Sequence, residues 1–141
     1  MTAKEYLRQA YLLDQRIDMD IREKDDLRKM AYSLSAPSLE ERVQHSAPNE
    51  ATYTRTIEKL IDMEHRIDAE IDLLVDLRKQ IHGVIDELDD PNSKLVLRCR
   101  YIHNMSFAQI GDQLYVDKRT AMRWHDAALA QVKVPTNPIV I

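Results

Sequence analysis

The sequence predicts an all-α protein in which a long helical hairpin or coiled coil is followed by three short helices. The composition of the 141 residues favours helices, since the chain has only 2 Gly, 6% aromatic and 31% charged residues. Two patterns agree with this class. Residues 50–89 carry a heptad repeat of apolar side chains, and residues 106–129 carry two short helical periodicities separated by a break.

The first predicted helix covers residues 2–33. Thr2 is a suitable N-cap, and Glu5 follows three residues later, as in a capping box. Apolar side chains recur on roughly one side of this helix: Tyr6, Ala10, Leu13, Ile17, Ile21, Leu27 and Met30. The pattern predicts that this side of the helix is buried.

Residues 33–50 are predicted to form a loop. The segment contains Pro37, Pro48 and four serines, which disfavour a continuous helix. Loops of this length are uncommon in compact domains. With this loop, the acidic helical segment, residues 1–89, would consist of two helices, one on either side of the loop.

The second predicted helix has the strongest pattern in the chain. Apolar residues spaced seven apart occupy the a positions of a heptad repeat: Tyr53, Leu60, Ile67, Leu74, Ile81 and Leu88. The d positions that follow hold Met63, Leu77 and Val84. A second apolar row is formed by Ile57, Ile71 and Ile85. The resulting stripe is wider than one partner helix covers.

Self-association is the expectation that follows from this wide stripe. The first helix would cover part of it in a hairpin, and a second copy of the chain would cover the rest, most simply in a homodimer. The predicted oligomerisation residues are Leu60, Ile67, Leu74, Ile81 and Leu88. The alternative is a monomer in which the C-terminal helices fold back over the stripe.

Charge divides the chain near residue 90. Residues 1–90 hold 13 Lys and Arg against 21 Asp and Glu, a net charge of −8, whereas residues 91–141 hold seven against three, a net charge of +4. A chain with this separation can present its basic end to a polyanion while its acidic end is repelled.

A second domain is predicted for residues 90–133. Asp90 is a suitable N-cap, and Pro91 is accepted in the first turn of a helix. The helix that follows runs to about residue 103, with apolar residues at helical spacing: Leu95, Cys99 and Ile102. The tail, residues 134–141, is either disordered or packs on this domain, and the sequence leaves both readings open.

Residues 106–129 fit a helix-turn-helix. Ser106 and Asp117 are suitable N-caps for two helices, and the break between the helices falls at residues 115–117. Apolar residues recur at helical spacing in the first helix, at Phe107, Ile110 and Leu114, and in the second, at Ala121, Trp124 and Ala128. We therefore expect Trp124 to lie in the core.

The other face of the second helix opens with basic and hydrogen-bonding side chains. Such groups at the start of a recognition helix are suited to reading base edges in the major groove. The candidate DNA-binding residues are Lys118, Arg119, Thr120, Met122 and Arg123. The predicted ligand is double-stranded DNA.

Residues 95–129 resemble region 4 of bacterial sigma factors. The resemblance rests on an Arg-Tyr-Ile element at residues 100–102, a Ser-Phe-x-x-Ile-Gly helix at residues 106–111, and an Arg-x-x-x-x-Ala-Leu ending at residues 123–129. In its organisation the chain is similar to small phage regulators, among them late-transcription activators of phages of Gram-positive bacteria. The resemblance implies promoter binding and contact with host RNA polymerase.

The chain departs from that family's pattern in two ways. Tyr115 stands where the turn usually has Gly, so the turn needs either a left-handed tyrosine or another shape. Ala121 and Trp124 stand where the family usually has a β-branched residue and Ile, an exchange of small for large within the core. The first departure bears on the angle of the recognition helix.

No nucleophile motif, glycine-rich phosphate loop or metal-ligand set is present, so we expect neither an enzyme nor a cofactor. Cys99 and His103 share one helix face, but two ligands do not make a metal site. With no signal peptide or membrane-spanning run, the sequence predicts a soluble cytoplasmic protein.

The sequence therefore predicts a DNA-binding transcriptional regulator of phage origin. Its N-terminal segment would mediate oligomerisation or contact with RNA polymerase. Two alternatives remain: a DNA-recognition subunit of a phage packaging machine, which would form a ring, and an adaptor that binds protein and not DNA.

Overall fold

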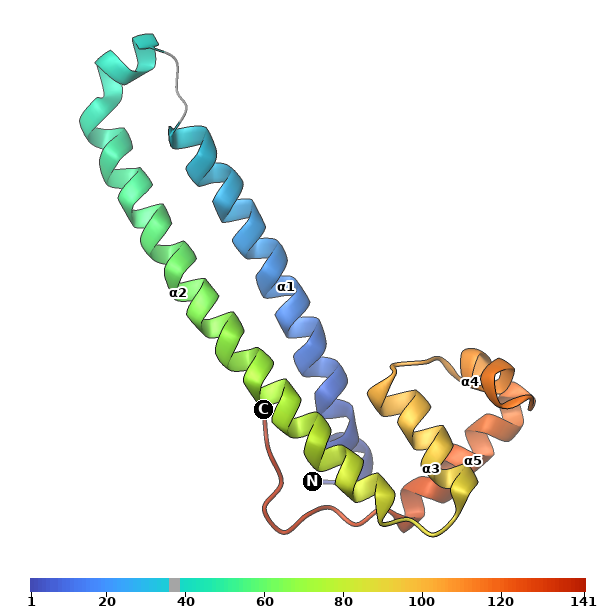
Figure 1. The fold of residues 1–141 in the computed structure, drawn as a ribbon. Coiled ribbons are helices and arrows are strands. Elements are labelled where there is room, and N and C mark those ends of the chain that lie inside the picture. The colour runs from blue at the N-terminus through green and yellow to red at the C-terminus, as the bar shows by residue number, and fades with distance from the viewer. Residues whose placement is uncertain (36–38) are drawn as a thin grey trace. The chain divides into compact units, whose positions relative to one another are not determined.

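The computed structural model describes the backbone of residues 1–35 and 39–141 and the side chains of residues 1–33 and 50–141. Every element described is helical, which confirms the predicted all-α class (Figure 1). The elements are α1 (Ala3–Ser35), α2 (Leu39–Asp86), α3 (Pro91–Leu97), the π-helical turn η1 (Arg98–Ile102), α4 (Phe107–Leu114) and α5 (Lys118–Gln131). α1 and α2 form a long antiparallel pair. None of the described helices is long and apolar enough to cross a membrane.

The connection between the long helices is shorter than the loop predicted for residues 33–50. α1 continues to Ser35 and α2 begins at Leu39, so that only residues 36–38 of the predicted loop fall between helices. Those three lie outside the described residues. α2 runs through Pro48. A proline inside a helix removes one backbone hydrogen bond and can kink the helix, but it need not end it.

The start of α1 follows the sequence prediction. The backbone N–H of Glu5 donates to Oγ1 of Thr2 at 3.1 Å, and the N–H of Thr2 donates to Oε2 of Glu5 at 2.9 Å. This capping box satisfies two donors that the first turn leaves unpaired. The buried face begins one turn later, with Tyr6, Leu7, Ala10, Leu13 and Ile17. Toward the other end of α1, Met30 is 57% exposed, so the predicted apolar side is not buried along its whole length.

The chain divides into two compact units, and the division does not fall at residue 90. One unit contains Met1–Asp14 together with Leu73–Ile141, and the other contains Gln15–Asp72. The short helices therefore share a unit with the beginning of α1 and the end of α2. Independent folding of residues 90–133 stays a prediction, and a fragment that begins at residue 90 would lose these neighbours.

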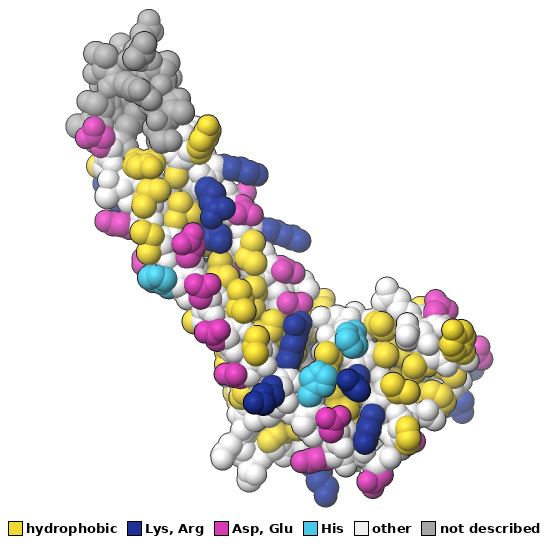
Figure 2. Space-filling model, in the orientation of Figure 1, with side chains coloured by type: hydrophobic (Ala, Val, Ile, Leu, Met, Phe, Trp, Pro, Cys, Tyr) yellow, Lys and Arg dark blue, Asp and Glu magenta, His cyan; other side chains and the backbone are white. Residues whose placement is uncertain are grey.

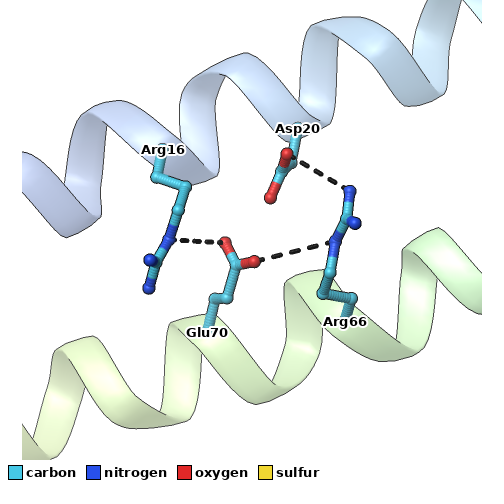
Figure 3. Close-up of polar contacts among 4 residues, drawn as sticks. All are labelled: Arg16, Asp20, Arg66 and Glu70. Carbon is cyan, nitrogen blue, oxygen red and sulfur yellow. Dashed lines mark hydrogen bonds and ion pairs between the residues drawn. The ribbon is translucent and has the colours of Figure 1, made fainter. Parts of the chain in front are cut away.

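Within the unit Gln15–Asp72, four side chains of alternating charge connect the two helices (Figure 3). Arg66 lies 3.3 Å from Asp20 and 3.8 Å from Glu70, and Arg16 lies 3.9 Å from the other oxygen of Glu70. Burial, followed by the neighbouring Asp20, raises the pKa of Glu70, whereas Arg16 and Arg66 act in the opposite direction. Because each helix supplies one acid and one base, the quartet favours this register of the pair.

A single chain already buries the five predicted oligomerisation residues, which are at most 8% exposed: Leu60, Ile67, Leu74, Ile81 and Leu88. The d-position residues Leu77 and Val84 are buried too. The heptad stripe thus forms core within the chain and gives no reason by itself to expect a second copy. Self-association stays a prediction. It would be mediated by apolar side chains that are still exposed, such as Ile71 and Val75. On the face shown in Figure 2, apolar side chains are interspersed with charged ones.

Two glutamines bind the backbone of the C-terminal tail to the long helices. Gln9 of α1 donates to the carbonyl of Ile139 at 2.8 Å and accepts from the N–H of Ile141 at 3.1 Å. Gln80 of α2 donates to the carbonyl of Asn137 at 3.1 Å and accepts from the N–H of Ile139 at 3.0 Å. The tail therefore packs on α1 and α2, in the same compact unit, which is neither of the two alternatives that the sequence leaves open.

Candidate nucleic-acid interface

The support helix of the C-terminal part begins where the sequence predicts. The side chain of Asp90 accepts from the N–H groups of Asn92 and Ser93, both at 3.3 Å, and Pro91 follows the cap directly. The helix then widens into η1, where the N–H of His103 donates to the carbonyl of Arg98, five residues back, at 3.1 Å. A π-helical turn of this kind holds one more residue than an α-helical turn.

The π-helical turn changes which side chains face the core. Val96, Leu97 and Tyr101 are buried, whereas Leu95 is 44% exposed. The prediction that Leu95 belongs to the core is wrong. It assumes one regular helical period up to residue 103, and η1 interrupts that period. Cys99 is buried, as its place in the pattern predicts.

α4 begins at a complete capping box. The N–H of Gln109 donates to Oγ of Ser106 at 3.2 Å, and the N–H of Ser106 donates to the side-chain oxygen of Gln109 at 2.9 Å. This confirms Ser106 as the N-cap. Ile110 is fully buried and Phe107 half-buried, so α4 packs through its predicted apolar face against α5.

The turn between α4 and α5 combines a left-handed tyrosine with a closely approached glycine. Tyr115 has φ 57° and ψ 43° and is 95% exposed. The N–H of Val116 donates to the carbonyl of Gly111 at 2.9 Å. A Cβ at Gly111 would lie only 2.7 Å from the carbonyl oxygen of Val116. The turn therefore requires glycine at 111, and at 115 it takes the left-handed alternative that the sequence leaves open.

Replacing Tyr115 by Gly is expected to stabilise the protein by about 1 kcal/mol, because glycine adopts the left-handed conformation at little cost. The exposed tyrosine ring gives up little packing in exchange. Denaturant unfolding measures the change. As a control, Ala127→Gly at an exposed position in the interior of α5 is expected to cost about 1 kcal/mol. A loss of stability in Tyr115→Gly would contradict a strained tyrosine.

α5 buries a face that differs by one residue from the predicted one. Asp117 precedes the helix in an extended conformation, as an N-cap does, but its side chain makes no capping hydrogen bond. Ala121, His125 and Ala128 are buried, and Trp124 is half-buried. The placement of Trp124 in the core is thus only partly right. His125 is the core residue that sequence reasoning missed, although it stands four residues after Ala121 and three before Ala128.

The five predicted DNA-binding residues lie together in the first six positions of α5. Lys118, Arg119 and Arg123 are exposed, Met122 is 42% exposed and Thr120 is half-buried. Arg123 donates to Oγ1 of Thr120 at 3.3 Å. Within the described part of the chain, none of the three basic residues forms an ion pair. Their charges therefore remain available to an anionic partner.

His125 joins α5 to η1 and α4. Its Nε2 lies 2.6 Å from the hydroxyl of Tyr101, its Nδ1 lies 3.1 Å from a carboxylate oxygen of Asp126, and the edge of its ring meets Phe107 at 5.0 Å between centroids. Because a carboxylate only accepts, Nδ1 carries the proton and Nε2 accepts from Tyr101. Burial lowers the pKa of His125, and Asp126 opposes this shift.

Acid is expected to destabilise the unit that contains His125. The folded state holds the pKa of this residue below its ordinary value of 6.5. The stability that the neutral ring contributes is therefore complete above that value and is lost as the pH falls through the lowered pKa. Melting temperatures between pH 8 and pH 5 should fall more steeply in the native protein than in His125→Gln. Parallel pH profiles would contradict a neutral buried histidine.

The comparisons with known proteins give one finding. A family model described as "Protein of unknown function (DUF1492)" matches residues 33–133, which include the last residues of α1 and all of α2, α3, η1, α4 and α5. Neither the curated proteins nor the solved structures contain a match.

Proposed function

We propose that this chain, which belongs to the DUF1492 family, is a sequence-specific DNA-binding transcriptional regulator. The observation that carries the proposal is the geometry of residues 106–131: a short capped helix, a tight turn, and a second helix that opens with exposed basic side chains. The buried residues of α5 fix that helix on α3 and α4, so its first turns are presented on a rigid support.

The exposed face of α5 has the chemistry that base-edge recognition needs. Arg119 and Arg123 stand four residues apart and project from one side of the helix, where arginine can bind guanine with two hydrogen bonds. Lys118 and Met122 have the same spacing and offer a cation for phosphate and an apolar contact for the thymine methyl group. Thr120 completes the set with a hydroxyl.

A role in transcription is supported by the resemblance of residues 95–129 to region 4 of sigma factors and of the chain to small phage regulators. The acidic balance of residues 1–90 disfavours contact of that segment with DNA. In this proposal, the N-terminal segment contacts host RNA polymerase or a second copy of the chain.

Selection from a pool of random DNA duplexes, followed by nuclease footprinting of the enriched sequence, tests the function. We expect one enriched motif and a protected site. The affinity should fall steeply with salt, since phosphate contacts release counterions. If no sequence is enriched and no duplex binds at low salt, the protein is not a DNA-binding regulator, and the adaptor hypothesis takes its place.

A further inference from the structure

A cavity of about 470 Å³ lies between the first turns of α1 and the segment formed by η1 and α4. All of its lining residues belong to the compact unit of Met1–Asp14 and Leu73–Ile141. The volume is in the range of sites for small molecules. None of the five candidate DNA-binding residues lines this cavity, so its ligand is a separate question from the function proposed above.

Three basic side chains from two segments line the cavity: Lys4 and Arg8 from α1, and Arg100 from η1. In the described part of the chain none of the three forms an ion pair. Arg100 is held in place, since its guanidinium lies 4.3 Å from the centroid of Phe107 and donates to the carbonyl of Met105 at 3.0 Å. Figure 2 shows basic and histidine side chains gathered where the start of α1 faces the short helices.

The positive charge of the cavity is not balanced from within. Burial is the main cause of the lowered pKa of His125, which also lines the cavity, and the charges of Arg100 and Lys4 act in the same direction. The carboxylate that acts on His125 belongs to Asp126, which is on the solvent side and is not part of the lining. Clustered cations beside low-dielectric walls attract an anion more strongly than the same charges on an open surface.

An unsatisfied acceptor lies beside these cations. The side-chain oxygen of Asn104 is buried, and no group among the described residues donates to it. Asn104 has φ 54° and lines the cavity. A buried acceptor without a partner destabilises the folded protein. A ligand with a hydroxyl or amino group would remove that destabilisation.

Aromatic faces supply the apolar part of the lining. Tyr11 of α1 is 40% exposed, and Phe107 at the start of α4 is half-buried. Both line the cavity. A ligand that bears only charge would leave these faces in contact with water, whereas one with a ring or other carbon framework would cover them.

We propose that this cavity binds a small organic phosphate whose phosphate group meets Lys4, Arg8 and Arg100 and whose donor group meets Asn104. Nucleoside monophosphates and sugar phosphates combine these features. Such a ligand contacts α1 on one side and η1 with α4 on the other. The bound ligand therefore links α1 to η1 and α4, the segments on which α5 packs.

Titration calorimetry of the full chain tests the proposal. The probes are the four nucleoside monophosphates, glucose 6-phosphate and inorganic phosphate. The variant Lys4→Gln/Arg8→Gln removes two exposed cations of the cavity and leaves Arg100 in its structural contacts. The matched control, Arg22→Gln/Lys29→Gln, removes one Arg and one Lys from exposed positions of α1 outside the cavity.

We expect one organic phosphate to bind in a 1:1 ratio, with affinity reduced at least tenfold in the cavity variant and unchanged in the control. The proposal is overturned if none of the organic phosphates binds at millimolar concentration, if the cavity variant binds as the native protein does, or if inorganic phosphate binds as tightly as the organic ones. A cavity variant that loses affinity only for DNA would assign these cations to the DNA backbone and would equally overturn the proposal.

Discussion

Replacing Arg119 and Arg123 together by Ala is expected to abolish sequence-specific DNA binding while leaving the fold intact. Both side chains are exposed and neither forms an ion pair within the described residues, so their removal costs little stability. Each specific base contact contributes about 1–3 kcal/mol. The double variant should therefore lose at least roughly 30-fold in affinity for the selected duplex.

The control for this experiment removes the same charge elsewhere. Arg22 and Arg55 are exposed residues of α1 and α2 outside the helix-turn-helix, and Arg22→Ala/Arg55→Ala should bind the selected duplex nearly as the native protein does. Circular dichroism verifies the helical content of each variant. If Arg119→Ala/Arg123→Ala protects the same site at the same concentration, α5 is not the recognition helix.

Leu74→Glu is expected to destabilise the chain by about 3–5 kcal/mol, because it places an unpaired charge in the core. Leu74 is only 6% exposed within a single chain. The loss should thus appear in denaturant unfolding even at protein concentrations where no oligomer forms. For a protein of ordinary stability this is a large fraction of the free energy of unfolding.

The neighbouring residue provides the matched control. Val75 is 60% exposed, so Val75→Glu should change the stability of one chain by less than about 0.5 kcal/mol. Light scattering of both variants separates core from interface. A native mass of two chains that falls to one in Val75→Glu would show that the exposed apolar residues mediate self-association. Equal stability of Leu74→Glu and the native protein at low concentration would contradict an intramolecular core.

Local signals in the sequence predicted the helix starts well. Thr2, Asp90 and Ser106 cap their helices through their own side chains, and such caps depend on a few neighbouring residues. The heptad positions were also predicted to be buried. The sequence predicted the first helix as a partner for only part of this stripe, because a repeat shows which side of a helix is apolar and not how much of it another part of the same chain covers. The prediction of a loop was wrong for residues 39–50, because α2 begins at Leu39 and continues through Pro48.

The sequence was sufficient to select candidate residues by their charge and position, but it did not predict how the helices around them pack. The five candidate DNA-binding residues were predicted from charge and position at the start of α5, and their binding to DNA stays a prediction. The π-helical turn η1 does not follow from the sequence, because it satisfies its hydrogen bonds five residues apart without a residue type that marks it. His125 was overlooked because Trp124 is the larger apolar side chain, although the hydrogen bond to Tyr101 allows the histidine to be buried.

The two glutamines that hold the tail also constrain when the protein can fold. Gln9 pairs with Ile139 and Ile141, which are 130 and 132 residues further along the chain. During synthesis α1 is complete long before these partners exist, so its first turns cannot reach their final surroundings until the tail has left the ribosome. Contacts at such separation are slow to form because a long loop must close first. The unit that contains the short helices is therefore expected to mature only after residues 137–141 have been synthesised, and not progressively from the N-terminus.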